Sequence, residues 1–123
     1  MNIHESSEDY LETILMLSRQ HGSARSVDIA ARLGVSKPSV SFAMKKLREN
    51  GYIQMGDDNR ITLTAAGEAI ASRMLERHTL LSALLVRLGV SEETARADAC
   101  KMEHDLSDET FEAIRNHLQA FPH

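Results

Sequence analysis

The placement of serines and glycines in the first half of the chain constrains the fold more than any other feature. Two stretches, 26–34 and 36–51, each begin with a serine and end with a glycine. Serine is a common helix N-cap, and glycine commonly ends a helix. The pattern therefore predicts helices over 27–33 and 37–50, joined by a tight turn at Gly34, which is the arrangement of a helix-turn-helix.

Apolar and small residues fall where the two helices of such a pair must pack against each other. They are Ile29, Ala30, Leu33, Val35, Val40 and Ala43. On the second helix, a period of about 3.6 residues gathers Val40, Ala43, Met44 and Leu47 on one side. The same period turns Pro38, Phe42, Lys45 and Glu49 outward, with Arg48 on a flank. The second helix therefore has one face for a core and one for a partner.

The segments around this helix pair predict a mostly α fold. Residues 52–55 and 60–63 alternate in polarity around the polar turn 56–59, as the two strands of a small β-hairpin do. A helix from Ser6 or Ser7 to His21 precedes the pair, and helices capped by Thr64, Ser91 and Ser107 follow the hairpin. We predict an N-terminal winged helix-turn-helix over 1–63 and an all-helical dimerisation domain over 64–123.

The last predicted helix carries an apolar stripe that suits an interface between two copies of the chain. Phe111, Ile114, Leu118 and Phe121 recur at helical spacing. We assign this stripe to homodimer packing.

Charge is unevenly distributed along the chain. The net charge is −4, yet residues 19–60 hold eight Lys or Arg against four acids. A basic block inside an acidic chain indicates a region that binds a polyanion, and its position on the predicted winged helix points to double-stranded DNA. We expect contacts with DNA from the exposed face of the second helix and from the hairpin. The residues are Lys37, Pro38, Ser39, Ser41, Phe42, Lys45, Lys46 and Arg60.

Phe42 is the unusual member of this group. An exposed phenyl ring can contact a thymine methyl group in the major groove. The alternative is that Phe42 packs beneath the hairpin or against a neighbouring helix. The sequence does not choose between these two interpretations.

Six possible metal ligands occur at helical spacing in three segments. Cys100, Glu103 and His104 stand at i, i+3 and i+4, so on a helix they point the same way. Asp9 and Glu12 stand at i and i+3 on the first predicted helix, and His78 lies in the middle of the fourth. We expect one or two divalent ions per protomer if the fold brings these groups together.

The chemistry of the donors limits the choice of metal. Carboxylates and imidazoles suit manganese(II) and iron(II), whereas the thiolate of Cys100 shifts the preference toward softer ions. We rank iron(II) slightly ahead of manganese(II). A single cysteine cannot form an internal disulfide, and the chain has neither a signal peptide nor an apolar run long enough for a bilayer. We expect a cytoplasmic protein with no membrane partner and no small-molecule substrate.

Together these residues resemble the diphtheria-toxin-repressor family of metal-dependent transcriptional regulators. The resemblance covers Ser7-Glu8-Asp9-Tyr10-Leu11-Glu12, the helix-turn-helix over 28–47, Arg77-His78, and Met102-Glu103-His104-Asp105-Leu106-Ser107. It is strongest to the short, two-domain members of the manganese-responsive branch. The resemblance implies a homodimer that binds palindromic operators when loaded with divalent metal and represses metal-uptake genes.

The resemblance also identifies where this chain departs from its relatives. Asp9, Glu12, His78, Glu103 and His104 correspond to ligands of the manganese branch, which has a carboxylate at the position of Cys100. The iron branch has cysteine there and methionine at the position of Asp9. Ser82 and Arg96 stand where the iron branch has two ancillary ligands. Ser36, Pro38 and Ser39 match its DNA-contact positions, whereas Phe42 replaces a glutamine.

Two other hypotheses remain from the residues alone. The first is a metal-independent winged-helix regulator that senses a small molecule or oxidation of Cys100. The second pairs Cys100 with His104 as the nucleophile and base of an enzyme. No oxyanion-hole motif or glycine-rich phosphate loop accompanies that pair in the sequence, and we do not expect an enzyme.

Overall fold

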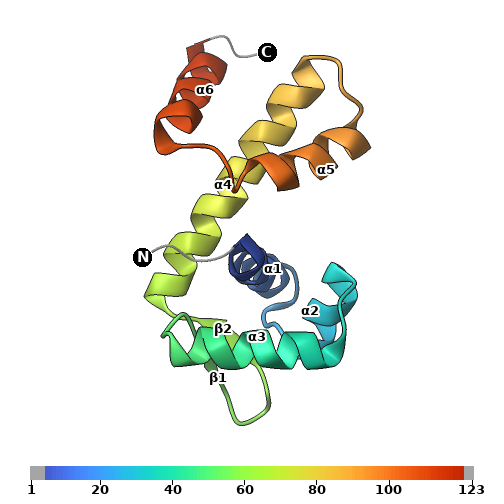
Figure 1. Ribbon diagram of the computed structural model, residues 1–123, viewed down its shortest axis with the longest axis vertical. Coiled ribbons are helices and arrows are strands. Elements are labelled where there is room, and N and C mark those ends of the chain that lie inside the picture. Colours follow the sequence, from blue (N-terminus) through green and yellow to red (C-terminus); the bar gives the residue numbers. More distant parts are fainter. Residues whose placement is uncertain (1–4, 121–123) are drawn as a thin grey trace. The chain divides into compact units, whose positions relative to one another are not determined.

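The computed structural model describes residues 5–120 and is mostly helical (Figure 1). Its elements in chain order are α1 (Glu5–His21), α2 (Ser26–Leu33), α3 (Lys37–Glu49), β1 (Ile53–Met55), β2 (Ile61–Leu63), α4 (Ala65–Arg87), α5 (Glu92–Met102) and α6 (Asp108–Ala120). The chain forms two compact units that divide within α4, between Arg73 and Met74. The predicted fold class is confirmed, and the predicted domain boundary at residue 63 stays a prediction.

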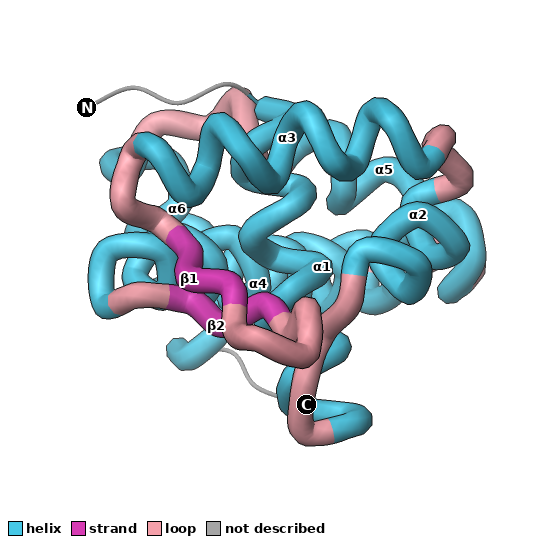
Figure 2. The backbone as a smooth tube through the Cα atoms, turned by 90° about the horizontal axis from the view of Figure 1, so that it is seen from below, coloured by secondary structure: helices cyan, strands magenta, loops and turns pink. Residues whose placement is uncertain are grey.

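In the first unit, α1, α2 and α3 pack with a two-stranded antiparallel hairpin (Figure 2). Ile53 pairs with Leu63 and Met55 with Ile61. The turn between the strands includes Asn59, whose φ of 64° lies in the left-handed region that asparagine tolerates. The predicted wing is therefore present, although each strand is one residue shorter than the alternating pattern suggested.

The core of the first unit comes from the apolar faces of its helices and from one face of the hairpin. Its fully or nearly fully buried side chains are Leu11, Ile14, Ile29, Val40, Met44, Ile53 and Ile61. Val35 was expected in this core, but it is exposed. It follows Gly34, which adopts a left-handed φ of 66° and ends α2, and the chain there turns along the surface.

Serine and threonine caps set the start of four helices as predicted. The side chains of Ser36, Ser91 and Ser107 accept hydrogen bonds from the backbone N–H groups three residues later, at 3.2, 3.4 and 3.1 Å. Thr64 does the same for Gly67 at 3.2 Å. These bonds satisfy backbone donors that a helix N-terminus leaves unpaired.

The predicted caps of the first two helices are wrong. Ser6 and Ser7 lie inside α1, which already includes Glu5, and Ser26 is the first residue of α2 rather than its cap. Arg25 takes the cap position without a side-chain hydrogen bond. Its neighbour Ala24 forms a β-bridge with Ile61 of the hairpin, so the chain is extended up to Arg25 and turns into the helix immediately afterwards.

Gly67 allows the start of α4 to lie directly against the hairpin. A Cβ atom at this position would be 2.1 Å from the backbone oxygen of Tyr52. Thr64 also donates its hydroxyl hydrogen to the oxygen of Gly51 at 2.6 Å. The beginning of α4 is thus fixed to the first unit by close backbone packing.

The second unit consists of most of α4 with α5 and α6. Its buried apolar residues are Met74, Leu81, Ala95, Ala99, Phe111 and Leu118. Ile114 on the predicted interface stripe is half-buried, and Phe121 lies outside the described residues. Within residues 5–120, no helix combines the length and apolar character that a membrane span requires.

Candidate functional site

The predicted ligands nearest the C-terminus do not all lie on one helix. Cys100 is an exposed residue of α5, but this helix ends at Met102, and residues 103–105 form a turn. Glu103 is therefore the C-cap of α5, and His104 lies in the segment 103–107, which we call the α5–α6 connector. The prediction of one helical face is therefore wrong for His104, whereas Glu103 keeps right-handed helical backbone angles and its N–H bonds the oxygen of Ala99 at 3.0 Å.

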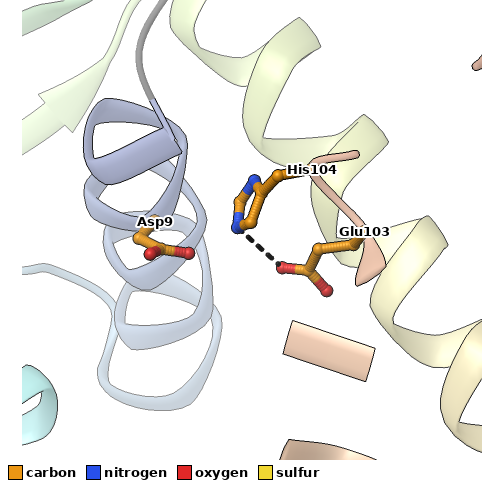
Figure 3. A group of neighbouring side chains, drawn as sticks. All are labelled: Asp9, Glu103 and His104. Atoms are coloured by element: carbon orange, nitrogen blue, oxygen red, sulfur yellow. Dashed lines mark ion pairs between the residues drawn. The ribbon is translucent and has the colours of Figure 1, made fainter. Parts of the chain in front are cut away.

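Glu103 is nevertheless the centre of a group of predicted ligands in the second unit. Its side chain is completely buried. Its Oε2 lies 3.0 Å from Nδ1 of His78, and its Oε1 lies 3.6 Å from Nε2 of His104 (Figure 3). Nδ1 of His78 is also 3.6 Å from Sγ of Cys100. The fold of this unit thus gathers four of the six predicted donors.

The electrostatic environment of Glu103 fits a bound cation. Its Oε1 atom is buried and has no hydrogen-bond partner. A buried carboxylate oxygen has lost its hydrogen bonds to water. Where no protein donor replaces them, the burial costs free energy. Carboxylate oxygen, imidazole nitrogen and thiolate sulfur are together the ligands of divalent transition ions. A metal ion bound here would bind the oxygen that the protein leaves without a hydrogen bond.

Asp9 and Glu12 lie on α1 in the first unit, as predicted. Their spacing of three residues places them on the same side of this helix, where Glu12 is buried and Asp9 is half-buried. Figure 3 includes Asp9 on α1. Their role as metal ligands stays a prediction.

Arg77 precedes His78 on α4 and contacts the connector that carries two of the predicted ligands. Its Nη1 donates to the backbone oxygens of Glu103 and Leu106, at 3.1 and 2.7 Å. Its Nη2 donates to Oδ1 of Asp108 at 2.6 Å, and its guanidinium carbon lies 5.2 Å from the centre of the Phe111 ring. The whole residue is only 4% exposed. Sequence reasoning used Arg77 only as part of a family motif, because a contact with distant backbone oxygens leaves no local pattern.

All nine predicted DNA-contact residues are exposed in the first unit. They are Ser36, Lys37, Pro38, Ser39, Ser41, Phe42, Lys45, Lys46 and Arg60. All but Arg60 lie on α3 or at its N-cap, and Arg60 lies in the turn of the hairpin. Their contacts with DNA stay a prediction.

Phe42 projects from α3 rather than packing into the protein. It is 63% exposed, and the ammonium group of Lys46 lies 5.0 Å from the centre of its ring. The interpretation that placed Phe42 beneath the hairpin is therefore wrong. A phenyl ring that remains in water on the surface of α3 is available to a partner.

A hollow of about 470 Å³ adjoins the outward face of α3, and we call it the basic hollow. The start of α2, the middle of α3 and the turn of the hairpin line it, and its cations are Arg25, Lys45 and Arg48. Within residues 5–120, none of these three side chains forms an ion pair or a side-chain hydrogen bond. Asp58 also lines the hollow but pairs with Arg60, so the positive charge of the three cations remains to attract anions to this concave surface.

Arg25 was not among the predicted DNA-contact residues. It lies before α2, outside the helix whose periodicity guided the prediction, and it reaches the basic hollow because Ala24 pairs with the hairpin. The excess of basic residues over 19–60 was the only hint. Arg60, in contrast, already pairs with Asp58 at 2.9 Å, and both side chains are about half exposed.

Comparisons with known families match both halves of the chain. Residues 2–59 match the N-terminal DNA-binding domain of iron-dependent repressors. Residues 64–123 match the metal-binding and dimerisation domain of the same repressors.

Individual relatives agree with these matches. A transcriptional regulator MntR from Escherichia coli is 48% identical over 90% of this chain and 72% of its own length. An HTH-type transcriptional regulator MntR from Lysinibacillus sphaericus is 37% identical over 93% of this chain and 82% of its own. A solved manganese-dependent transcriptional repressor in complex with manganese has a TM-score of 0.81 and 32% identity, covering 92% of this chain. This chain spans about half of that solved chain, at 52%.

Proposed function

Because this chain belongs to the family of iron-dependent repressors, which are transcriptional regulators and not enzymes, we propose that a divalent metal ion controls its binding to DNA. Iron(II) or manganese(II) serves as a corepressor that enables a cytoplasmic homodimer to bind palindromic operators and repress metal-uptake genes. The observation that carries this proposal is the buried carboxylate of Glu103, which lies beside two histidines and has one oxygen without a donor.

The proposed ligands come from both units. His78, Cys100, Glu103 and His104 belong to the second unit, and Asp9 and Glu12 on α1 complete the set for one or two ions per protomer. When bound, the ion supplies positive charge and fixed coordination geometry. Ligation by both sets of residues favours one arrangement of the two α3 helices in a dimer. Metal promotes DNA binding because it binds this arrangement more tightly than the other arrangements of the dimer.

The identity of the metal rests on two opposing considerations. The similarity to a repressor described as manganese-dependent favours manganese(II). The thiol of Cys100, 3.6 Å from Nδ1 of His78, favours iron(II), since thiolate is the softer ligand. Substituting Cys100→Asp should therefore raise the affinity for manganese(II) relative to iron(II), which anaerobic competition between the two ions measures.

The proposed DNA interface combines α3 with the basic hollow. Exposed serines and lysines of α3 contact base edges and phosphates, and the cations of the hollow hold a phosphate of the DNA backbone. Phosphate contacts give affinity without sequence information, so sequence preference comes from the outward residues of α3, Phe42 among them.

The proposed homodimer uses α6 and the end of α4. A second hollow, of about 560 Å³, is lined there by residues that include Leu84, Ala113 and Ile114. Apolar side chains left partly exposed on adjacent helices suit burial against a second copy of the chain.

The decisive experiment measures operator affinity with and without metal. An operator is first selected from a pool of random DNA duplexes, using the protein with manganese(II) or iron(II) under anaerobic conditions. Wild-type protein should bind the selected duplex tightly with metal and weakly after chelation. Glu103→Gln should lose the response to metal, whereas Asp105→Asn should keep it, because Asp105 is an exposed carboxylate of the same connector. Equal affinity with and without metal in the wild type would refute the proposal.

Control by thiol oxidation is a second candidate function, favoured by the exposure of Cys100 beside His78. A regulator of this kind changes its DNA affinity when the thiol is oxidised and ignores a chelator. Cys100→Ser removes that response and leaves the affinity for DNA intact. A metal-dependent regulator responds to the chelator instead. Chelation abolishes its DNA binding even when Cys100 is fully reduced.

A further inference from the structure

The α5–α6 connector is held by an unusual device, a buried guanidinium bound to its backbone. After Asp105, whose N–H bonds the oxygen of Met102 at 3.1 Å, the connector leaves helical structure until α6 begins at Asp108. Nη1 of Arg77 donates to the oxygens of Glu103, before this stretch, and of Leu106, within it. The N–H of Glu103 still bonds the oxygen of Ala99 at 3.0 Å, so the connector is held at its start by α5 and further along by a side chain of α4.

Burying Arg77 has a free-energy cost that its position must offset. Its Nε atom is buried without a hydrogen-bond partner, and its charge partner Asp108 is 80% exposed. Buried charges are normally retained only where they are paired and fully hydrogen-bonded. The three bonds that Arg77 does form are charge-assisted and therefore stronger than neutral ones. Two of them go to the connector rather than to a counterion.

The next residue on α4 is His78, itself a proposed ligand. The backbone of α4 therefore fixes the relation between the imidazole of His78 and the guanidinium of Arg77, and that guanidinium binds the backbone oxygen of Glu103. The distance of 3.0 Å between His78 and Glu103 depends on both. One turn of α4 thus supplies a ligand and also sets where the opposing carboxylate lies.

We propose that Arg77 is a positioning residue for the metal ligands Glu103 and His104, an inference that rests on the proposed metal-dependent function. Arg77 does not bind the ion. It holds the connector in the ligand-presenting conformation before metal arrives, so less conformational freedom is lost on binding. Groups that orient ligands from outside the coordination sphere typically contribute about 10- to 100-fold to metal affinity.

Arg115 provides a matched control in the same unit. Its guanidinium lies 5.0 Å from the centre of the same Phe111 ring and pairs with Glu76 and Glu112. It is also a charged clamp between α4 and α6, but no bond joins it to the oxygens of Glu103 or Leu106 within the described residues. A purely stabilising role for Arg77 predicts similar behaviour of the two arginines.

The test measures manganese(II) affinity by anaerobic calorimetry and by electron paramagnetic resonance of the free ion. Full-length wild type, Arg77→Met, Arg77→Lys and Arg115→Met are compared well below their melting temperatures. Arg77→Met should bind manganese(II) about 10- to 100-fold more weakly. Arg77→Lys should recover part of the loss, because an ammonium group can reach one of the two oxygens. Arg115→Met should bind as the wild type does, even if its melting temperature falls equally.

Asp108→Ala keeps the test decisive if both Arg77 variants fail to fold. Asp108 is exposed, so its removal spares the core while releasing one of the three partners of the guanidinium. A several-fold loss of affinity that Asp108→Asn restores is the expected result. Wild-type affinity in both Asp108 variants would then overturn the proposal.

The remaining outcomes separate this inference from the proposed function. If Glu103→Gln abolishes metal binding while folded Arg77 variants bind normally, the positioning role is wrong and the metal site stands. If Arg115→Met loses as much affinity as Arg77→Met, Arg77 only stabilises the fold. If the wild type binds neither manganese(II) nor iron(II), both proposals fail together.

Discussion

The charged side chains of the two units differ in burial and pairing. Around α3 in the first unit, Arg25, Lys45 and Arg48 are exposed and form no ion pairs within the described residues. In the second unit, Arg77 and Glu103 are buried and bound to other protein groups. Exposed, unpaired charges cost little to maintain and attract a large anion through solvent. Buried charges are costly and are positioned precisely, as discrimination among small ions requires.

The sign of the charge alone does not show which partner a region of the chain binds. The chain as a whole is acidic, with a net charge of −4, yet α3 carries or adjoins the cations of the basic hollow. Likewise, Glu103 is one acid among many, and its burial and its histidine neighbours distinguish it as a candidate cation ligand.

Removing charge from the basic hollow should have the largest effect. Arg25→Ala with Arg48→Ala should weaken DNA binding equally on operator and unrelated duplexes, because phosphates carry no sequence information. Each lost contact should reduce the magnitude of the slope of log affinity against log salt by about 0.9, so the two substitutions together should reduce it by about 1.8 per protomer. Anisotropy titrations across salt concentrations measure this slope.

Arg32→Ala is the control for charge. Arg32 is exposed on the same helix, α2, and bonds only Gln20, away from the hollow. It should leave the slope nearly unchanged. A double variant with the slope of the wild type would show that the unpaired cations do not meet DNA, and the contrast between the units would lose its functional meaning.

Adding one carbon at Gly67 should destabilise the first unit strongly. A Cβ at 2.1 Å from the oxygen of Tyr52 forces the hairpin away from α4, and overpacking of this kind costs about 1–3 kcal/mol. Gly89→Ala at the end of α4 is the counterpart in the second unit. No atom lies within 4 Å of its added carbon, so only the backbone strain of its φ of 104° remains, at about 1 kcal/mol.

Urea unfolding followed by circular dichroism compares these two variants. The free energy of unfolding should fall further in Gly67→Ala. Equal losses at the two glycines would mean that the hairpin yields easily, and the first unit would be less tightly packed than its geometry indicates.

Helix N-caps should contribute equally to the stability of the two units, although the charged residues of the two units differ in burial. Ser36→Ala and Ser107→Ala each remove one hydrogen bond to a backbone N–H and should each cost about 1 kcal/mol of stability. Thermal unfolding without ligands measures both. A far larger loss at Ser107 would show that the cap also supports the neighbouring connector.

Phe42→Ala should have the smallest effect, confined to sequence preference. Loss of a contact between the ring and one thymine methyl is worth about 0.8 kcal/mol, or about fourfold in affinity at a single base position. Repeating the duplex selection with the variant measures this preference. An unchanged preference would mean that the ring contacts no base, and Lys46→Ala would show whether the neighbouring ammonium does.

Much of the fold follows from local patterns. Caps, glycine stops and helical periodicity predicted the six helices, and alternating polarity predicted the two strands of the described residues, because each signal is decided within a few residues. The starts of α1 and α2 were predicted incorrectly, and at α2 the reason is nonlocal. The bridge between Ala24 and Ile61 joins positions far apart in the chain, and it makes Ser26 a helical residue instead of a cap.

The candidate site was predictable in its residue types but not in its geometry. Spacing identified Cys100, Glu103 and His104, yet it placed all three on one helix. The helix ends at Met102, where the connector oxygens bind Arg77 from α4. Arg25 and the exposure of Phe42 likewise depend on how separate elements meet, which no period within one helix encodes.

The helix α4 has a consequence for how the chain unfolds. Its 23 residues divide between the two units at Arg73 and Met74, so each unit contains one end of the same helix. Isolated helices shorter than about 12–15 residues are marginal in water, and neither portion comfortably exceeds that length. Melting of either end therefore removes support from the other, and heat should take the chain apart in a single cooperative transition rather than unit by unit.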